Sequence, residues 1–557
     1  MSSVEIITKP FKRSSLESIH GKYYTDYPIV YFLNNNTKVY IGETVAVRNR
    51  MNNHLNNPER KSLDRMTLIV HEKFNRSATY NIETKLINYF LADERYELLN
   101  KSQTADSVSH NYYDKSFYNE TLFNEIWEKL KEKNYVTHSR EAIENKDIFK
   151  LSPFKELTID QIELKDKIIS ICEQHINDEE PFIFLVKGEA GTGKSVVLSA
   201  VFNRIQELTK EKSSPLFNTN NYLLVNHTEM LKTYKKIAEK VKVLKKKNFD
   251  KPTPFINRMK KKNQKADIVL VDEAHLLLTK PDRFNSFNEQ NHLEEIIKHS
   301  KMVILVFDDK QVLKMKSFWD ENKLHNIIGE FQNEEFILKN QFRMHASEQM
   351  IKWIDHFVEK RILPIPEEEE FDFRIFESAA IMYEEICRRN NEVSLARMVS
   401  TFDYVHKKDG QIYYIEEGQF KLPWNITEGD TTWAERDETI KEVGSIYTIQ
   451  VFDLNYVGVI LGPLVSYDEE NEELKIITNN YKDTEAFRGK DEFENPEYIK
   501  EKIILNSINI LLKRGIKGLY IYASDSKLRN RLLELYRNRY KFNENMRVAE
   551  EKAKYGN

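Results

Sequence analysis

The stretch Gly188 to Ser195 has the residue types and the spacing of a loop that could hold a polyphosphate. It follows the apolar run 182–186 and precedes the amphipathic run 196–202. A strand, an unobstructed loop and a helix N-terminus in that order let successive backbone N–H groups surround phosphates. In such a loop Lys194 would reach the outer phosphates and the Ser195 hydroxyl would hold Mg²⁺. The predicted nucleotide-binding residues are Gly188, Glu189, Ala190, Gly191, Thr192, Gly193, Lys194 and Ser195. The sequence therefore predicts binding of ATP or GTP.

Acidic residues follow two later apolar runs. Asp272 and Glu273 close the run that starts at Asp267, and Asp308 follows a second run with Gln311 three residues later. Behind a phosphate-binding loop, an Asp at the end of a buried strand binds Mg²⁺ through water, and a neighbouring Glu polarises the water that attacks the γ-phosphate. We predict these roles for Asp272 and Glu273.

The first hundred residues carry a second set of side chains that could do chemistry: Tyr31, Tyr40, Arg50, His54 and Glu83. The tyrosines lie on two short β-rich runs that are separated by an asparagine turn, which predicts a hairpin. The arginine and the histidine are four residues apart, so they share one face of a predicted helix. The glutamate lies in a later helical stretch, 80–90. Cleaving a phosphodiester needs a metal, a cation and a proton acceptor around one phosphorus atom.

These residues, with the segment Tyr40-Ile41-Gly42, resemble the GIY-YIG nuclease domain over roughly the first hundred residues. The first motif departs from that family, because it reads Ile29-Val30-Tyr31 and lacks the glycine. The resemblance implies that Glu83 ligates Mg²⁺ or Mn²⁺ and that Arg50 stabilises the phosphorane-like charge. It also implies that Tyr31 or Tyr40, helped by His54, moves the proton of the attacking water.

From residue 157 onward the order of motifs resembles a superfamily-one helicase. The resemblance implies that Gln161 reads adenine and that Asp308 and Gln311 sense the γ-phosphate. It also implies that Arg343 acts as an arginine finger and that Arg514 meets the γ-phosphate from a second lobe. Thr448, Gln450 and Asp453 would contact nucleic acid or couple it to ATP. The sequence departs from this family at Val451, Asp453 and Lys513, where glycine, glutamate and threonine are usual.

These elements predict an α/β chain in which a small α+β GIY-YIG domain precedes two RecA-like lobes of parallel sheet. The predicted divisions are a nuclease-like domain at 1–105, a helical connector at 106–150, lobe 1 at 151–362, lobe 2 at 363–540 and a charged tail at 541–557. A proline and acid stretch, 364–370, suggests the boundary between the lobes. The chain also resembles a bacterial group in which such a helicase-like core follows a GIY-YIG domain. In that group the core was long labelled only as a domain of unknown function. This resemblance covers nearly the whole chain.

The composition narrows the class of protein. A chain of 557 residues is long enough for several domains. Its two cysteines lie far apart, which excludes a disulfide scaffold or a cysteine-rich zinc site. No signal peptide or membrane-length apolar run is evident, so we expect a soluble cytoplasmic enzyme. Basic and acidic residues nearly balance, but lysines crowd into 232–265, either as a solvated helix face or as a track for phosphates.

Taken together, the sequence predicts an ATP-dependent helicase or translocase with a metal-dependent endonuclease. We expect it to act on DNA rather than RNA, in defence against phage or other foreign DNA. ATP and Mg²⁺ are the expected cofactors, with Mn²⁺ as an alternative at the nuclease site, and proteins encoded nearby are candidate partners. Two alternatives stay open: a nucleotide-switched sensor or scaffold whose nuclease fold is inactive, and an RNA-directed enzyme.

Overall fold

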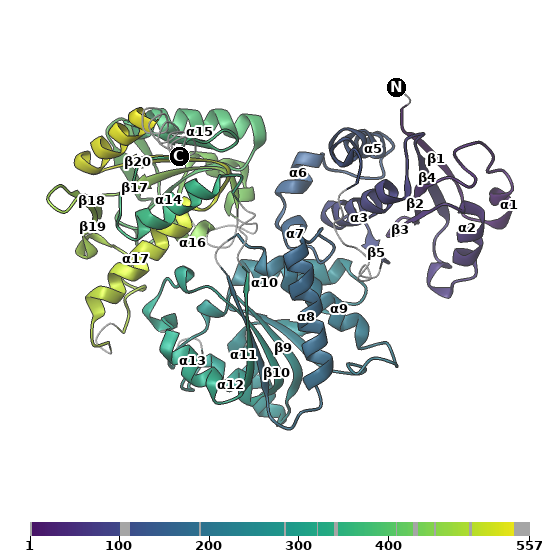
Figure 1. Cartoon of the computed structure of the whole chain (residues 1–557), viewed down its shortest axis with the longest axis horizontal. Helices are drawn as coiled ribbons and strands as arrows, with labels where there is room; N and C mark the ends of the chain where they lie inside the picture. The colour runs from purple at the N-terminus through teal and green to yellow at the C-terminus, as the bar shows by residue number, and fades with distance from the viewer. Residues whose placement is uncertain are drawn as a thin grey trace, which may run out of the picture.

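Three larger β-sheets organise the chain, and each is built from a different part of the sequence (Figure 1). The computed structural model describes residues 3–100, 112–188, 191–282, 286–319, 321–338, 344–407, 409–426, 433–449, 453–489 and 493–539. The first sheet lies in an N-terminal unit, the second in lobe 1 and the third in lobe 2.

The sheet of the N-terminal unit has the strand order β1-β4-β2-β3-β5, and only its β3–β5 pair is parallel. Side chains alternate along the central strand β2, so Val30 and Phe32 pack on one face while Tyr31 packs on the other with Met51 of α2. This unit contains β1 (Glu5–Pro10), α1 (Arg13–Leu16), β2 (Ile29–Asn34), β3 (Lys38–Thr44), α2 (Val47–Leu55), β4 (Arg65–Val70), α3 (Arg76–Asp93) and β5 (Glu97–Leu98). The predicted hairpin and both predicted helices are present.

A helical connector joins this unit to lobe 1. It contains α4 (Lys115–Phe117), a π-helical turn (Tyr118–Leu122), α5 (Phe123–Glu132), α6 (Arg140–Asn145) and α7 (Asp147–Lys150). The amphipathic α5 buries Phe123, Ile126 and Trp127 in a hydrophobic core that continues from the N-terminal sheet into the helices of lobe 1. The N-terminal unit is therefore fixed to lobe 1 by shared burial of apolar surface.

Lobe 1 is a parallel sheet in the order β11-β6-β10-β9-β7-β8. Its strands are β6 (Phe182–Gly188), β7 (Asn221–Val225), β8 (Phe249–Asp250), β9 (Ala266–Asp272), β10 (Ser300–Phe307) and β11 (Gln332–Leu338). Its helices are α8 (Ile159–His175), α9 (Lys194–Leu208), α10 (Thr228–Lys240), α11 (Pro252–Lys262), α12 (His292–Lys298) and α13 (Glu321–Gly329). The nearly all-apolar strands β6, β9 and β10 lie inside the sheet, where helices cover both faces.

Lobe 2 is a second parallel sheet, in the order β12-β20-β17-β13-β16. Its strands are β12 (Asp372–Ile375), β13 (Ala396–Ser400), β16 (Val443–Gly444), β17 (Leu454–Leu461) and β20 (Gly515–Ala523). Its helices include α14 (Glu348–Val358), α15 (Ala379–Val393), α16 (Ile446–Ile449), α17 (Pro496–Leu512) and a helix over 526–539. Two small hairpins pair β14 (Tyr414–Glu417) with β15 (Phe420–Pro423) and β18 (Val465–Asp468) with β19 (Glu473–Ile476).

The packing of α14 moves the boundary between the lobes. We predicted it between residues 362 and 363, but Met350, Trp353 and Phe357 of α14 are buried in the core of lobe 2. The apolar face of α14 packs against the hydrophobic core of the lobe 2 sheet, so α14 belongs to lobe 2. The α/β fold class with two parallel-sheet lobes is confirmed.

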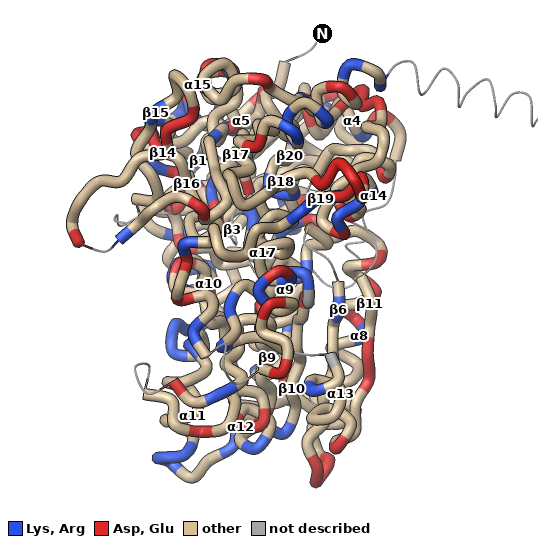
Figure 2. Tube along the Cα trace, turned by 90° about the vertical axis from the view of Figure 1, so that its left-hand side faces the viewer, with Lys and Arg blue, Asp and Glu red and all other residues tan. Residues whose placement is uncertain are grey.

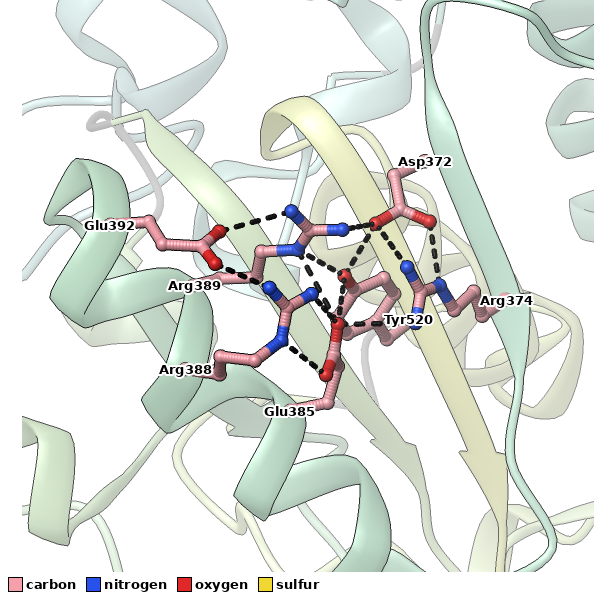
Figure 3. Close-up of polar contacts among 7 residues, drawn as sticks. All are labelled: Asp372, Arg374, Glu385, Arg388, Arg389, Glu392 and Tyr520. Carbon is pink, nitrogen blue, oxygen red and sulfur yellow. Dashed lines mark hydrogen bonds and ion pairs between the residues drawn. The ribbon is translucent and has the colours of Figure 1, made fainter.

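A charged network ties α15 to the edge of the lobe 2 sheet (Figure 3). Asp372 of β12 accepts hydrogen bonds from Arg374 at 2.7 and 3.0 Å, and from Arg389 at 2.6 Å. The Tyr520 hydroxyl of β20 donates to the same carboxylate at 2.6 Å. Glu385, Arg388 and Glu392 complete the network. The charges balance, so the network stabilises this edge rather than presenting net charge.

Within the described ranges, no helix combines the length and the apolar character that crossing a membrane would require.

Candidate active sites

The predicted phosphate-binding loop lies between β6 and α9. Gly191 and Gly193 have φ angles of 89° and 78°, a left-handed backbone that glycine adopts without strain. Gly193 precedes the first residue of α9, so the N-terminus of that helix faces the loop. Gly188 ends β6, and Thr192 is buried. Glu189 and Ala190 lie outside the described residues.

Lys194 is held at the centre of this site. Its Nζ donates to the Gly188 carbonyl oxygen at 2.5 Å and to Asp308 Oδ2 at 3.1 Å, and both side chains are buried. Gln311 Nε2 donates to the same Asp308 oxygen at 2.7 Å. Burial opposes ionisation of Asp308, but the Lys194 charge and the bond from Gln311 outweigh it and lower the pKa of Asp308. The Lys194 ammonium is thus held beside the loop by Gly188 at the end of β6 and by the Asp308 carboxylate directly after β10.

The Ser195 hydroxyl donates to Asp272 Oδ1 at 3.1 Å, and the Tyr234 hydroxyl donates to Asp272 Oδ2 at 2.7 Å. Burial, together with the charge of the adjacent Glu273, raises the pKa of Asp272. A divalent cation would offset both effects, and a hydroxyl beside a carboxylate is a donor set that Mg²⁺ accepts. The residues present therefore fit the magnesium ion of a nucleotide complex.

Glu273 has a left-handed backbone with φ of 51°, and its Oε2 lies 3.3 Å from His275 Nε2. The carboxylate is mostly buried and lines the same pocket as the loop. This position suits the predicted polarisation of an attacking water.

Lobe 2 contributes Arg514 to the opposite side. The side chain is 1% exposed, and its Nη1 lies 3.7 Å from Asp453 Oδ1. Burial lowers the pKa of both His275 and His227 of lobe 1, and the Arg514 charge lowers both further, so Arg514 lies within electrostatic range of lobe 1. Arg343 and Gln450 lie outside the described residues.

One pocket of about 290 Å³ connects these parts. Its lining includes Lys194, Ser195 and Gln311 of lobe 1 and Asp453 of lobe 2. The connector also takes part, since Lys150 lines the pocket and its Nζ donates to the Asp453 carbonyl oxygen at 3.3 Å. All three parts therefore meet at the candidate nucleotide site.

Gln161 lies in this pocket, but both ends of its amide are engaged by the protein. Its Oε1 accepts from the Thr158 N–H at 3.0 Å, and its Nε2 donates to the Thr192 carbonyl oxygen at 3.0 Å. Gln161 thus holds the phosphate-binding loop against the start of α8. Thr448 is engaged similarly, because its hydroxyl donates to the Ser445 carbonyl oxygen at 2.8 Å within its own turn.

A second cluster forms in the N-terminal unit, where β2, β3 and α2 bring the predicted side chains together. Tyr31 Oη lies 2.8 Å from His54 Nε2, and Arg50 Nε donates to Tyr31 Oη at 3.1 Å. Arg50 Nη2 lies 3.5 Å from Tyr40 Oη, and the rings of Tyr40 and His54 pack edge to face. Gly42 is required here, because a Cβ at that position would lie 2.3 Å from Tyr31 Oη.

Burial and the charges of Arg50 and Arg60 lower the pKa of His54 to about 4. His54 is therefore neutral near pH 7 and can accept the Tyr31 proton through Nε2, while Tyr31 accepts from Arg50.

Glu83 of α3 is near this cluster and is mostly buried. Burial and the charge of Glu43 raise the pKa of Glu83 to about 8, against the opposing effect of Arg50. Two carboxyls in one another's field suit a divalent cation held by one or two carboxylates and completed by water and substrate. Among the described residues no group of three or more His, Cys, Asp or Glu is arranged to hold a metal. Glu83 and Glu43 are thus the protein's candidate ligands.

Sequence reasoning missed three residues of these sites: Glu43, Arg60 and Tyr234. The Arg60 guanidinium lies 3.9 Å from the centre of the Tyr40 ring and is buried. Glu43 directly follows the Tyr40-Ile41-Gly42 segment, so its position in sequence offered a signal. Arg60 and Tyr234 carried no signal in the sequence. Only the packing of the turn Pro58–Arg60 and of α10, respectively, brings them to the sites.

The protein family described as "Schlafen group 3, DNA/RNA helicase domain" matches residues 181–525 of this chain. The chain is 41% identical over 410 residues to the uncharacterized protein YPL245W of Saccharomyces cerevisiae, an alignment that covers 68% of this chain and 90% of the relative.

Among solved structures, the Pif1 helicase from Candida albicans is 13% identical with a TM-score of 0.27, covering 69% of this chain and 99% of that chain. The DUF1998 helicase MrfA bound to DNA is 11% identical with a TM-score of 0.27, covering 73% of this chain and 50% of that chain. The sequence relationships, and not these superpositions, carry the family assignment.

Proposed function

The chain belongs to the Schlafen group 3 DNA/RNA helicase domain family, and from this membership we propose that it is an ATP-driven translocase or helicase that also cuts nucleic acid. Its core is a helicase-like ATPase. The observation that carries the proposal is the pocket in which Lys194 and Ser195 of lobe 1 and Asp453 of lobe 2 meet, with Nη1 of Arg514 of lobe 2 lying 3.7 Å from the Asp453 carboxylate.

In this proposal the nucleotide phosphates bind the loop, with Lys194 at the outer phosphates. Ser195 and Asp272 hold Mg²⁺, which supplies charge stabilisation on the phosphates when it is bound. Glu273 orients and polarises the attacking water, and Arg514 faces the γ-phosphate when the lobes close. Nucleotide-dependent closing of lobe 2 on lobe 1 would then move nucleic acid.

Nuclease activity is the finer part of the proposal. Tyr31, oriented by Arg50 and His54, would relay the proton of the water that attacks phosphorus, while the leaving sugar oxygen takes a proton from solvent. Arg50 would stabilise the charge on the non-bridging oxygens. Glu83, with Glu43, would hold Mg²⁺ or Mn²⁺, which polarises the phosphodiester when bound. The close contacts among Tyr31, Arg50 and His54 support this reading of the first unit as GIY-YIG-like.

Lysines of the run 232–265 lie on and around α10 and α11, where Figure 2 draws basic residues in blue. Part of it fixes the N-terminal unit, since Lys240 Nζ donates to the Glu94 carbonyl oxygen at 2.6 Å and Lys242 pairs with Glu59 at 3.0 Å. Part of it is open: Lys236 and Lys247, both exposed, form no ion pair with any residue that the structure describes. We propose this open part as a contact for nucleic-acid phosphates.

DNA is the proposed substrate, and cutting phage or other foreign DNA is the proposed role, because a motor fused to a nuclease suits it. RNA is the second candidate, and the family description, which names both polymers, favours testing it directly. Competition between matched DNA and RNA strands for stimulation of the ATPase would decide between them.

The experiment that tests the proposal uses purified protein, supercoiled plasmid and Mg²⁺ or Mn²⁺, with and without ATP. Glu83→Ala and Lys194→Ala are compared with Glu348→Ala and Lys352→Ala, which remove an exposed ion pair on α14. We expect cleavage to be lost in Glu83→Ala and to depend on Lys194, with both controls active. Intact DNA-stimulated ATPase without cleavage by the wild type would instead support a sensor or a pure translocase. Absence of ATPase would refute the motor.

A further inference from the structure

One carboxylate bridges the two lobes through a lysine from each. Asp355 lies on α14 of lobe 2, and its Oδ1 accepts from Lys513 Nζ of lobe 2 at 2.7 Å. The same oxygen accepts from Lys310 Nζ of lobe 1 at 3.3 Å. Neither the loop motifs nor the acidic strand ends include Asp355.

Both lysines are direct neighbours of residues in the pocket. Lys310 lies in the turn between Asp308 and Gln311, and Asp308 accepts hydrogen bonds from both Gln311 and the loop lysine Lys194. Lys513 immediately precedes Arg514. A continuous series of polar and covalent links therefore runs from the phosphate-binding loop, through Asp355, to the arginine of lobe 2.

The bridge between the two lysines depends on the negative charge of Asp355, because the Asp355–Lys513 pair is poorly accessible to solvent. The Lys513 side chain is 2% exposed and Asp355 is 20% exposed, so the pair is little screened by solvent. Without the negative charge, two ammonium groups that now share one oxygen would repel each other across the border between the lobes. Lys513 stands where the helicase pattern usually has threonine, so this pairing uses a residue that departs from that pattern.

Other bonds hold the same border without Asp355. Asn506 Nδ2 of α17 donates to the Val312 carbonyl oxygen at 3.0 Å, and the Met315 N–H donates to the Ala486 carbonyl oxygen at 2.8 Å. Because these bonds remain, loss of Asp355 should change the relative position of the two lysines rather than separate the lobes.

We propose that Asp355 is a positioning residue that sets Arg514 of lobe 2 against the Asp308–Gln311 turn of lobe 1, so that hydrolysis requires the bridge. This inference rests on the proposed ATPase function of the pocket. It predicts that Asp355 affects the turnover step and not the capture of nucleotide, because Asp355 is not among the described residues that line the pocket.

The test compares Asp355→Asn with Glu359→Gln, which changes an exposed acid one turn further along at the end of the same helix. Steady-state ATPase with saturating single-stranded DNA is measured together with equilibrium binding of a fluorescent ATP analogue. We expect Asp355→Asn to lower kcat about ten-fold or more, with KM and the binding constant within about two-fold of the wild type, and Glu359→Gln to match the wild type. A kcat equal to that of the wild type would overturn the proposal.

A second variant keeps the proposal testable if Asp355→Asn folds poorly. Lys310→Met removes the lobe 1 ammonium of the bridge and leaves both Asp355 and Lys513 in place. We expect Lys310→Met to lower kcat, and we expect the double variant with Asp355→Asn to be no slower than Asp355→Asn alone, because both act on one bridge. Full activity of Lys310→Met, or independent additive losses, would refute the coupling. A wild type without ATPase would instead refute the proposed function itself.

Discussion

Replacing Glu83 by glutamine should stabilise α3 in the absence of metal at neutral and alkaline pH. Burial and the Glu43 charge raise the pKa of Glu83 from 4.5 to about 8. Because this pKa is higher in the folded chain than in the unfolded chain, ionising Glu83 costs folding free energy. The cost is nearly absent below pH 4.5, grows as the pH rises, and is complete above about pH 8. A glutamine has nearly the same shape but carries no charge, so the variant avoids this loss of folding free energy.

The size of the effect follows from the shift. At about 1.4 kcal/mol for each pH unit between 4.5 and 7, the full cost at pH 7 is about 3 kcal/mol. Solvent reaches part of the carboxyl, and screening leaves about 1 to 3 kcal/mol. The equilibrium constant for opening α3 should therefore fall by about ten-fold or more in Glu83→Gln at pH 7.

Amide hydrogen exchange on α3 measures this directly. Wild type, Glu83→Gln and the exposed control Glu348→Gln are compared at pH 5 and pH 7, with correction for intrinsic exchange. We expect extra protection in Glu83→Gln at pH 7, much less at pH 5, and none in the control. Added Mg²⁺ or Mn²⁺ should protect α3 in the wild type only, since a cation stabilises the ionised carboxylate. Equal protection of wild type and Glu83→Gln at pH 7, or equal metal protection in both, would refute this account.

Three further changes have defined outcomes. Gln161→Ala should weaken ATP and GTP binding by similar factors in competition titrations, because its amide contacts the loop backbone; a selective loss of ATP binding would show that it reads the base. Tyr31→Phe should lower metal-dependent plasmid cleavage about ten-fold or more while leaving ATPase unchanged, and undiminished cleavage would remove Tyr31 from the reaction. Asp372→Asn should lower the urea stability of lobe 2 by about 1 to 3 kcal/mol without changing ATP binding, whereas an unchanged unfolding midpoint would mean that the network adds nothing.

Local pattern was enough to predict the elements of the nucleotide site. The apolar runs before Gly188, Asp272 and Asp308 are central strands of a parallel sheet, and the carboxyl ends of parallel strands meet at one edge. The spacing of the glycine-rich loop and the order of the strands together therefore predict that Lys194, Asp272 and Asp308 lie close together. The ammonium–carboxylate contact of Lys194 with Asp308 follows from that geometry.

Residues contributed by packing between elements could not be predicted this way. Tyr234 reaches Asp272 from the middle of α10, and Arg60 reaches Tyr40 from a short turn, so neither position carries a sequence signal. The lobe boundary was displaced for a related reason, since an amphipathic stripe shows that α14 has a buried face but not which core buries it. For Gln161, a motif predicts proximity to nucleotide but not which hydrogen bonds the amide already makes within the protein, so its reading of adenine stays a prediction.

The shared core between the N-terminal unit and lobe 1 constrains how ATP could influence the nuclease cluster. α3, which carries Glu83, packs with α5 and with α9, whose first residue is Lys194, in one continuous hydrophobic core. We therefore expect closing of lobe 2 to reach the Tyr31–Arg50–His54 cluster through the connector or through bound nucleic acid. The connector is placed for this, since Asn145 accepts from Asn455 Nδ2 at 3.2 Å and the Asp147 N–H donates to Glu435 Oε1 at 3.1 Å. We therefore expect any movement of lobe 2 to break or shift these bonds, so that the connector would respond to the state of the candidate nucleotide site.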